Sequence, residues 1–255
     1  MQIVLLFIFL GVTSAANALP SAVQTTPMQL NGLWQQYQSG NEHTVDAYYP
    51  HLPCFKKASE QTNIPLTLLL AMARGESNFS SDAVSKANAI GVMQIQWPGT
   101  AKHLGITEKK KLYDPCLNID AGARYIDELL QRYEGNLYLA LAAYNYGPGR
   151  IRVGSSPNAI PDGAHWYSEY VYDHLTYILD AQIQDYSQTL SHTLITFNRP
   201  YRAKDFVIQM QKKAPEVRFD WFKKPFDRFE VVVFFENESQ KRKASKVLKR
   251  LGFTL

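Results

Sequence analysis

Glu76 is the residue whose type and setting point most directly to chemistry. It follows the strongly apolar stretch Leu66 to Met72 and precedes the polar residues Ser77 and Asn78. Burial among apolar side chains favours the protonated form of a carboxyl group, which suits a general acid. The alternative is an exposed glutamate at a helix C-terminus, where the negative end of the helix dipole is mildly unfavourable. The sequence around Glu76 by itself favours neither interpretation over the other.

Three stretches with an ordered set of motifs add to Glu76. Residues 76 to 94 are ESNFSSDAVSKANAIGVMQ, residues 140 to 151 are ALAAYNYGPGRI, and residues 169 to 171 are EYV. A Glu-Ser pair, a Gly-x-Met-Gln and an Ala-Tyr-Asn in this order resemble the motifs of the soluble lytic transglycosylase family. Each motif is weak alone, but the order and spacing together are specific. The resemblance spans roughly residues 50 to 185.

This resemblance implies a goose-type-lysozyme-like helical fold and an enzyme that cleaves murein, the peptidoglycan of the bacterial wall. It implies that Glu76 acts first as acid and then as base at the bond between N-acetylmuramic acid and N-acetylglucosamine. The product would carry a 1,6-anhydro end, with no water consumed and no cofactor or metal needed. The residues that the resemblance implies for substrate binding are Ser77, Ser85, Met93, Gln94, Tyr144, Asn145 and Tyr170.

Some of these residues have simpler explanations. Met93 and Tyr144, taken singly, fit core packing, since methionines and aromatic residues at helical spacing are usually buried. Gln94 and Asn145 are less easily explained that way, because a buried amide needs partners for several donors and acceptors. Tyr146 stands where the family usually has alanine, so a bulky ring enters near the cleft and puts the fit of the glycan in question.

Two rival functions remain open. Ordinary glycosidases need two carboxylates. Asp82, Asp114 and Glu169 also lie near the motifs, but Asp82 and Asp114 are typical turn residues, and none of the three is assigned a catalytic role beside Glu76. The first rival is a muramidase that hydrolyses the same bond. The second is a catalytically silent peptidoglycan-binding or scaffold protein, which could dispense with Glu76.

Helices are needed to position these residues, and the pattern from residue 50 to 186 predicts them with almost no strands. Pro65 suits the first position of a helix after Asn63, a residue type that caps helices. The predicted helices are Pro53 to Gln61, Pro65 to Glu76, Trp97 to Leu104, Ile119 to Tyr133, Leu137 to Tyr144 and Tyr167 to Tyr186.

The charge balance changes abruptly late in the chain. Residues 1–190 hold 12 Lys and Arg against 16 Asp and Glu, a net charge of −4, whereas residues 191–255 hold 15 against 7, a net charge of +8. The apolar pattern there predicts the order β-α-β-β-α of a small ferredoxin-like module. We therefore expect an α+β chain, with a mainly α-helical lysozyme-like catalytic domain at residues 46–188 and a basic ferredoxin-like βαββα domain at residues 191–255.

The partner of the basic module has three interpretations. Basic surfaces with aromatic side chains bind single-stranded nucleic acid. The N-terminus, however, predicts that the protein is exported from the cytoplasm, so no nucleic-acid partner is expected. The segments Arg228 to Val233 and Gln240 to Gly252 weakly resemble SPOR-type murein-binding domains, which implies cell-wall binding. Otherwise the basic residues of Gln240 to Leu251 form a solvated helix face.

The N-terminus predicts export. Residues 3–12 form an apolar run too short to span a bilayer, and Ala16-Asn17-Ala18 fits a signal peptidase site, so residues 1–18 are expected to be a signal peptide. A membrane anchor is the alternative. Residues 19–45 are expected to be a leader and linker with at most a short helix around Leu33 to Tyr37. A periplasmic protein with no membrane span after cleavage follows, and a partner in the cell-envelope machinery is left open.

Cys54 and Cys116 are the two cysteines of the chain. In an exported protein two cysteines normally form a disulfide. The alternative is two separately buried thiols. No cluster of His and Cys has the spacing of metal ligands, so no metal site is expected.

Overall fold

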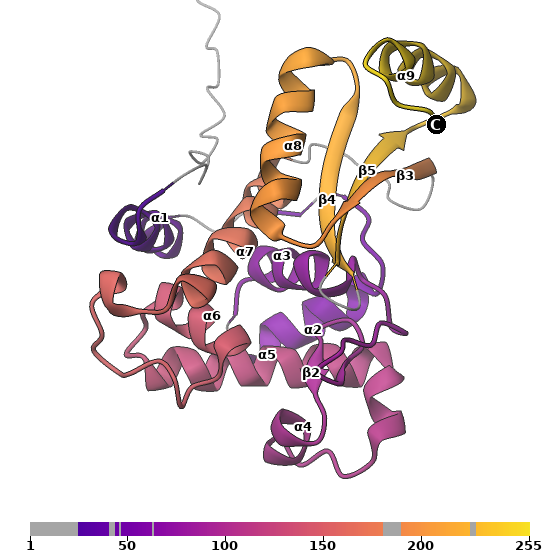
Figure 1. Cartoon of the computed structure of the whole chain (residues 1–255). Coiled ribbons are helices and arrows are strands. Elements are labelled where there is room, and N and C mark those ends of the chain that lie inside the picture. Colours follow the sequence, from indigo (N-terminus) through magenta and orange to yellow (C-terminus); the bar gives the residue numbers. More distant parts are fainter. Residues whose placement is uncertain (1–24, 41–43, 46, 63, 181–189, 225–227) are drawn as a thin grey trace, which may run out of the picture.

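The structure, a computed structural model, describes residues 25–40, 44–45, 47–62, 64–180, 190–224 and 228–255 (Figure 1). Helices dominate up to residue 180, and a three-stranded sheet with two helices follows. This is the α+β class that the sequence predicted. The expected signal peptide lies outside the described residues. Within those residues no helix combines the length and apolar character needed to cross a membrane.

The helical part begins before the predicted catalytic domain and also contains a short hairpin. Its helices and strands are α1 (Pro27–Ser39), α2 (Leu52–Thr62), α3 (Leu66–Ser77), β1 (Ala89–Ile90), β2 (Ile95–Gln96), α4 (Gly99–His103), α5 (Pro115–Arg132), α6 (Leu137–Tyr146) and α7 (Asp162–Asp180). Two 3-10 helices join them, η1 (Lys109–Tyr113) and η2 (Pro157–Ala159). Every predicted helix is present with shifted bounds, although the predicted end of the last one lies outside the described residues.

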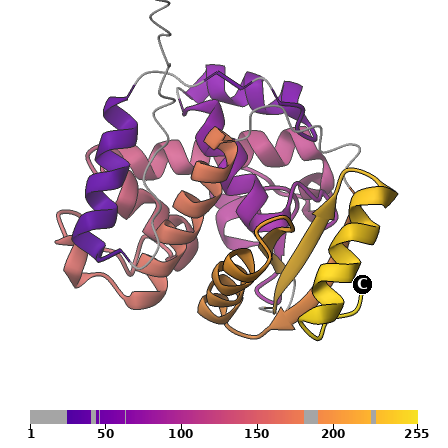
Figure 2. The ribbon, with the colours of Figure 1, turned by 90° about the horizontal axis from the view of Figure 1, so that it is seen from above.

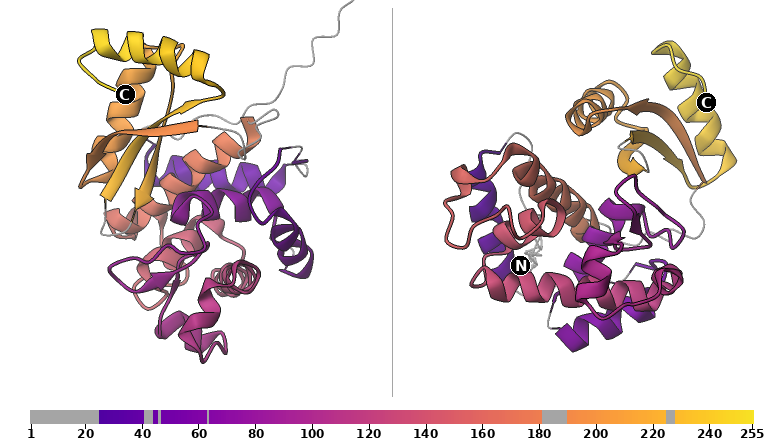
Figure 3. Two further views of the ribbon diagram at one scale, coloured as in Figure 1. Left: turned by 90° about the vertical axis from the view of Figure 1, so that its right-hand side faces the viewer. Right: turned by 60° about the horizontal axis from the view of Figure 1, so that its bottom comes forward.

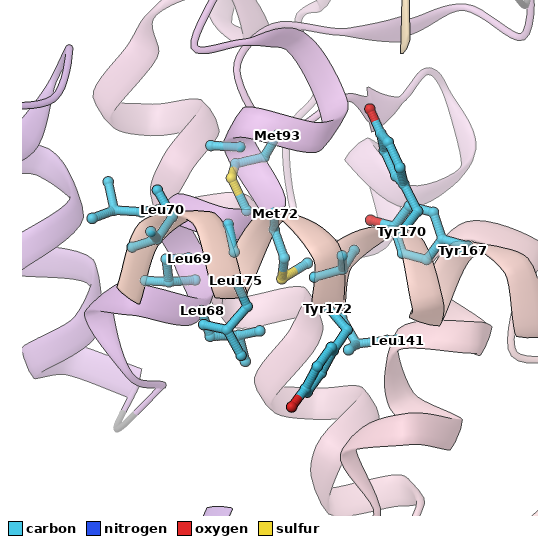
Figure 4. Close-up of a cluster of buried hydrophobic side chains, with 14 of the residues drawn as sticks. Leu68, Leu69, Leu70, Met72, Met93, Leu141, Tyr167, Tyr170, Tyr172 and Leu175 are labelled. Carbon is cyan, nitrogen blue, oxygen red and sulfur yellow. The ribbon is translucent and has the colours of Figure 1, made fainter. Parts of the chain in front are cut away.

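The helix that carries Glu76 is the centre of this part. Every residue of α3 from Thr67 to Ser77 is buried, and Figure 4 shows its side chains among those of α7. Gly75 permits the close packing, because a Cβ there would lie 2.9 Å from His174 Cδ2 and 3.0 Å from Tyr170 Cε1. Asn78, in the left-handed conformation with φ of 51°, ends the helix. The last turn of α3 is thus held rigidly against α7.

The expected linker at residues 19–45 needs a correction. Residues Pro27–Ser39 form the helix α1, which has a capping box from Thr26 and Gln29. Its buried face holds Leu30, Trp34 and Tyr37, spaced as one helical stripe. The Trp34 indole donates a hydrogen bond to Ser168 Oγ of α7 at 2.9 Å. The polar residues that outnumber this stripe hid the helix in the sequence.

The predicted disulfide is confirmed. Cys54 of α2 and Cys116 of α5 are bonded, with a Cα–Cα distance of 5.0 Å. The bridge ties the helix before α3 to the long helix α5. In the chain-entropy description, a loop of this size stabilises the fold by about 4 kcal/mol through the unfolded state.

The C-terminal module has the predicted order of elements. It consists of β3 (Leu190–Phe197), α8 (Pro200–Lys213), β4 (Arg218–Lys224), β5 (Arg228–Phe235) and α9 (Glu238–Arg250). The sheet order is β3-β5-β4, and both pairs are antiparallel. The third strand in sequence therefore lies between the first two, as in a split βαβ unit.

This module packs against the helical part. Figure 1 shows the ends of β4 and β5 next to α3, and Figure 3 shows the module on one side of the helices. In Figure 2, α1 lies at the opposite edge from α9. Arg74 of α3 forms a buried ion pair with Asp220 of β4. Lys204 of α8 pairs with Asp173 at 2.9 Å and with Glu169 at 3.3 Å, both on α7. The helices α3 and α7 therefore share an interface with the basic module.

Candidate active site

Glu76 lies in the last turn of α3, and its side chain is only 3% exposed. The Tyr167 hydroxyl donates a hydrogen bond to Glu76 Oε1 at 2.6 Å. The other carboxylate oxygen, Oε2, is 3.6 Å from Lys223 Nζ. Glu76 is thus a sheltered carboxyl group with one neutral donor and one cation beside it.

Two pockets meet at Glu76, and together they are named the groove here. The larger has a volume of about 500 Å³ and the smaller about 250 Å³. The residues that line both pockets are Glu76, Ser85, Gln94 and Lys223. One hydroxyl, one amide and one ammonium from these residues therefore lie around the carboxyl group, and two further cations, Lys86 and Lys224, line one pocket each.

Four of the expected substrate-binding residues come together in the groove. Ser85, Gln94, Tyr144 and Asn145 line the larger pocket with Glu76. They come from the segment before β1, the turn between β1 and β2, and the end of α6. Asn145 is exposed, so its amide is open to a ligand.

The other three expected residues are turned to neighbouring parts of the protein. The Ser77 hydroxyl lines the smaller pocket but donates to the Val92 carbonyl at 2.8 Å. Met93 is fully buried, and its side chain packs against Gly122. The Tyr170 hydroxyl donates to the Gly75 carbonyl at 2.9 Å. The expectation that Met93 lines the groove is therefore corrected, because its side chain points into the core.

Asn118 of α5 fixes the turn that carries Gln94, and sequence reasoning missed it. Its fully buried amide accepts from the Met93 N–H at 2.7 Å and donates to the carbonyls of Ile90 and Leu112. Gly91 must be glycine, since it has φ of 80° and a Cβ would lie 2.4 Å from Asn118 Nδ2. A buried amide with all three hydrogen bonds made holds such a turn in one shape.

Tyr144 and Tyr167 are neutral hydrogen-bond donors on either side of the site, Tyr144 to the turn that carries Gln94 and Tyr167 to Glu76. The Tyr144 hydroxyl donates to the Met93 carbonyl at 2.9 Å. Burial raises the pKa of both phenols well above the ordinary value, and the negative charge of Glu76 raises both further. Each hydroxyl therefore keeps its proton at neutral pH, and Tyr167 remains a donor to Glu76.

Sequence reasoning also missed Tyr167 and Lys223. Tyr167 lies one turn before Tyr170 on the same buried face of α7, so helical spacing from the EYV motif was the available signal. Lys223 belongs to β4 of the basic module, and nothing in its local sequence distinguishes it from Lys224. Only the docking of β4 onto α3 brings it to Glu76.

A second carboxylate lies on the same wall. Asp82, which the sequence assigned to a solvated turn, is exposed but lines the smaller pocket with Glu76. As for metals, the described residues contain no group of three His, Cys, Asp or Glu side chains that could hold an ion.

Comparisons with known proteins match the part of the chain that holds Glu76. The family model described as "Transglycosylase SLT domain" matches residues 53–162. The soluble lytic murein transglycosylase of Escherichia coli (strain K12) is 36% identical over 115 residues, which cover 42% of this chain and 18% of that protein. The membrane-bound lytic murein transglycosylase C of Haemophilus influenzae (strain PittEE) is 35% identical over 144 residues, 49% of this chain and 40% of that protein.

A solved structure is similar to the same part of the chain. The 70 kDa soluble lytic transglycosylase of Escherichia coli is 31% identical, with a TM-score of 0.46, over 50% of this chain and 24% of that one. The chain thus spans less than half the length of these relatives. Tyr167, Tyr170 and Lys223 lie beyond the residues of the family match, which ends at the first residue of α7. The part of the chain that matches the model of the transglycosylase SLT domain, residues 53–162, contains Glu76.

Proposed function

We propose that this protein is a murein lytic transglycosylase that cleaves the β-1,4 bond between N-acetylmuramic acid and N-acetylglucosamine and leaves a 1,6-anhydro end. One observation carries the proposal. Glu76 is a buried carboxyl group at the meeting point of two pockets lined by hydroxyl and amide groups. The family match and the names of the relatives support the substrate class.

The proposed reaction uses Glu76 twice. Protonated Glu76 gives its proton to the glycosidic oxygen, and the bond to the anomeric carbon breaks. The N-acetyl group of the substrate supports the positive charge on the sugar. Glu76, now a carboxylate, removes the proton from the 6-hydroxyl of the muramic acid, whose oxygen closes onto the anomeric carbon. Tyr167 orients the Glu76 carboxyl group through both steps with its 2.6 Å hydrogen bond.

Glu76→Gln tests this proposal, because it keeps the shape of the side chain and removes its transferable proton. Loss of murein cleavage by at least about 1,000-fold is expected, with an unchanged melting temperature. Glu60→Gln, an exposed position on α2, is the matched control and should keep full activity. Undiminished release of muropeptides by the Glu76 variant would remove Glu76 from the mechanism.

A hydrolytic muramidase is the second candidate, and Asp82 favours it. Inverting glycosidases use a second carboxylate as a base for water, and Asp82 lines the smaller pocket with Glu76. Mass spectrometry of the products distinguishes the two reactions, since anhydro ends support the transglycosylase and reducing ends support the muramidase. In the first case Asp82→Asn should retain most of the activity, and in the second it should lose it.

We further propose that the enzyme is exported to the periplasm and that its basic module binds an anionic component of the wall. The predicted signal peptide supports the first point. The second is supported by the exposed basic residues of α9, which are Arg242, Lys243, Lys246, Lys249 and Arg250. A pull-down with purified sacculi at low salt tests it by comparing the whole protein with a variant whose α9 cations are replaced by glutamine. Equal retention would leave α9 as a solvated face.

A further inference from the structure

Lys223 reaches the catalytic groove from outside the residues of the family match. It lies near the end of β4, and its side chain is 18% exposed. Its ammonium is 3.6 Å from Glu76 Oε2, and the residue lines both pockets of the groove. The basic module therefore supplies part of the wall at the point where the two pockets meet.

The position of Lys223 is held by several contacts. Its backbone N–H donates to the Tyr170 hydroxyl at 3.0 Å, and that hydroxyl donates to the carbonyl of Gly75 at 2.9 Å. The Trp221 ring packs on Tyr170 with the centroids 4.8 Å apart. One tyrosine thus ties the backbone of Lys223 to Gly75, the residue next to Glu76, which keeps the lysine side chain within reach of the Glu76 carboxyl group.

The ion pair with Glu76 conflicts with the first step of the proposed reaction. A Glu76 that carries a proton no longer provides negative charge for the Lys223 ammonium. A largely buried ammonium without a counter-charge costs free energy. Tyr144 and Tyr167 beside Glu76 are neutral phenols and cannot replace the charge. Lys86 and Lys224, which line one pocket each, are further cations and cannot replace it either. Asp82 shares the smaller pocket but is exposed, so water screens its charge.

The murein strand carries the missing charge. Muramic acid differs from N-acetylglucosamine by a lactyl group, which ends in a carboxylate or is extended by a peptide that has carboxylates of its own. A polymer of N-acetylglucosamine alone has none. A strand in the groove can therefore offer an anion to Lys223 while Glu76 takes up a proton from solvent.

We propose that Lys223 is a specificity residue, which pairs with Glu76 in the empty groove and with a carboxylate of the murein strand in the occupied one. The inference rests on the proposed function. It makes the basic module part of the active site, and it assigns to that module the distinction between murein and uncharged glycans of the same backbone.

Binding to catalytically inactive protein tests this without turnover. The Glu76→Gln protein and its Lys223→Met and Lys223→Arg derivatives are titrated with three ligands by calorimetry. These are chitotetraose, the peptide-free tetrasaccharide of alternating N-acetylglucosamine and N-acetylmuramic acid, and that tetrasaccharide with its stem peptides. Lys56→Met, exposed on α2 and absent from both pockets, is the control for net charge.

Lys223→Met is expected to weaken binding of a carboxylate-bearing ligand by about 10-fold, the size of one partly buried charge pair, and to change chitotetraose binding less than about 2-fold. Lys223→Arg and Lys56→Met should preserve the preference. If Lys223→Met weakens binding of the peptide-free tetrasaccharide alone, the lactyl carboxylate is the partner of Lys223. If it weakens binding of the peptide-bearing tetrasaccharide alone, a carboxylate of the stem peptide is the partner.

Equal losses for all three ligands, or no loss for any, would overturn the assignment of Lys223. In those cases murein would still bind, so the proposed function would stand. Absence of binding by both murein tetrasaccharides to the Glu76→Gln protein would instead count against the proposed function and the inference together. Melting temperatures within a few degrees of the parent confirm that the variants are folded.

Discussion

The Tyr167 hydroxyl hydrogen-bonds Glu76 Oε1 at 2.6 Å, although the two residues are 91 positions apart in the chain. Each is buried, Glu76 in the last turn of α3 and Tyr167 on the inner face of α7. Glu76 can exchange protons with a substrate only if its carboxyl group is held in one orientation. In the proposed mechanism the contact between α3 and α7 therefore orients the catalytic acid as well as forming part of the core.

Tyr167→Phe should lower kcat for murein by about 10- to 100-fold, because it removes a buried donor that orients the acid. The KM should change little, since the ring remains. Steady-state assays on purified murein measure both. Tyr172→Phe is the matched control on the same helix, and Figure 4 shows its ring directed away from Tyr167 and Tyr170. If the two variants lose the same activity, Tyr167 has no special role.

Asp220→Ala should destabilise the protein by about 3 kcal/mol, because it leaves the Arg74 guanidinium buried without its carboxylate. Arg74 is 1% exposed, and it still contacts the Tyr177 ring at 3.4 Å from the centroid. Urea unfolding measures the change. Asp205→Ala, exposed on α8, should shift stability by less than about 0.5 kcal/mol. Equal stability of both variants would show that the interface between α3 and β4 contributes little.

Trp34→Ala should cost about 3 to 5 kcal/mol, the usual range for removing a buried aromatic side chain. Trp34 is fully buried, and its indole also donates to Ser168. Gln35→Ala, one position further on the exposed face of α1, is the control. Calorimetric melting of both variants would reveal whether α1 behaves as a structural part of the helical domain. A linker would tolerate both substitutions equally.

Asp173 should make stability fall as the pH rises from about 4 to 6. Burial raises the pKa of Asp173 to about 6 from an ordinary 3.8, while Lys204 lowers it and Glu169 and Asp220 raise it. Because the folded state binds this proton more tightly than the unfolded chain, the contribution is present below the unfolded pKa and lost through the folded pKa. The loss is on the order of 3 kcal/mol.

Unfolding free energies at pH 4 and pH 7 check this dependence. Asp173→Asn cannot ionise, so the variant should lack this part of the decline, and its stability relative to the parent should improve at the higher pH. A decline of the same size in parent and variant would assign the pH dependence to other groups.

Much of the architecture was predictable because it depends on local patterns. The dense apolar stretch Leu66 to Met72 predicted the buried helix α3. Two runs of strand-favouring residues and one alternating stretch predicted the strands of the C-terminal module. The two cysteines predicted their own pairing. The prediction failed at α1, where Leu30, Trp34 and Tyr37 form a narrow stripe among polar residues. Three apolar residues among many polar ones do not identify a helix in the sequence. They are recognised as a buried face only from their packing against α7.

The candidate site divides along a similar line. The order and spacing of the motifs can be read from the sequence alone, and they predicted that Glu76, Ser85, Gln94, Tyr144 and Asn145 form one site. The five residues line the same pocket. The motifs did not determine the direction of each side chain. The Met93 side chain points into the core, and the Tyr170 hydroxyl donates a hydrogen bond to the Gly75 carbonyl. These outcomes depend on how α5, α6 and α7 pack around the turn that Asn118 fixes.

Only the tertiary structure decided which groups reach the Glu76 carboxyl group. Tyr167 depends on the rotation of α7 against α3. Lys223 depends on the docking of β4, a strand from a module that charge and apolar pattern had set apart as a separate domain. Periodicity and composition describe how a segment folds against some neighbour, but they do not specify which neighbour. That choice comes from the Arg74–Asp220 ion pair and the aromatic contacts of Tyr170, which form between residues far apart in the sequence.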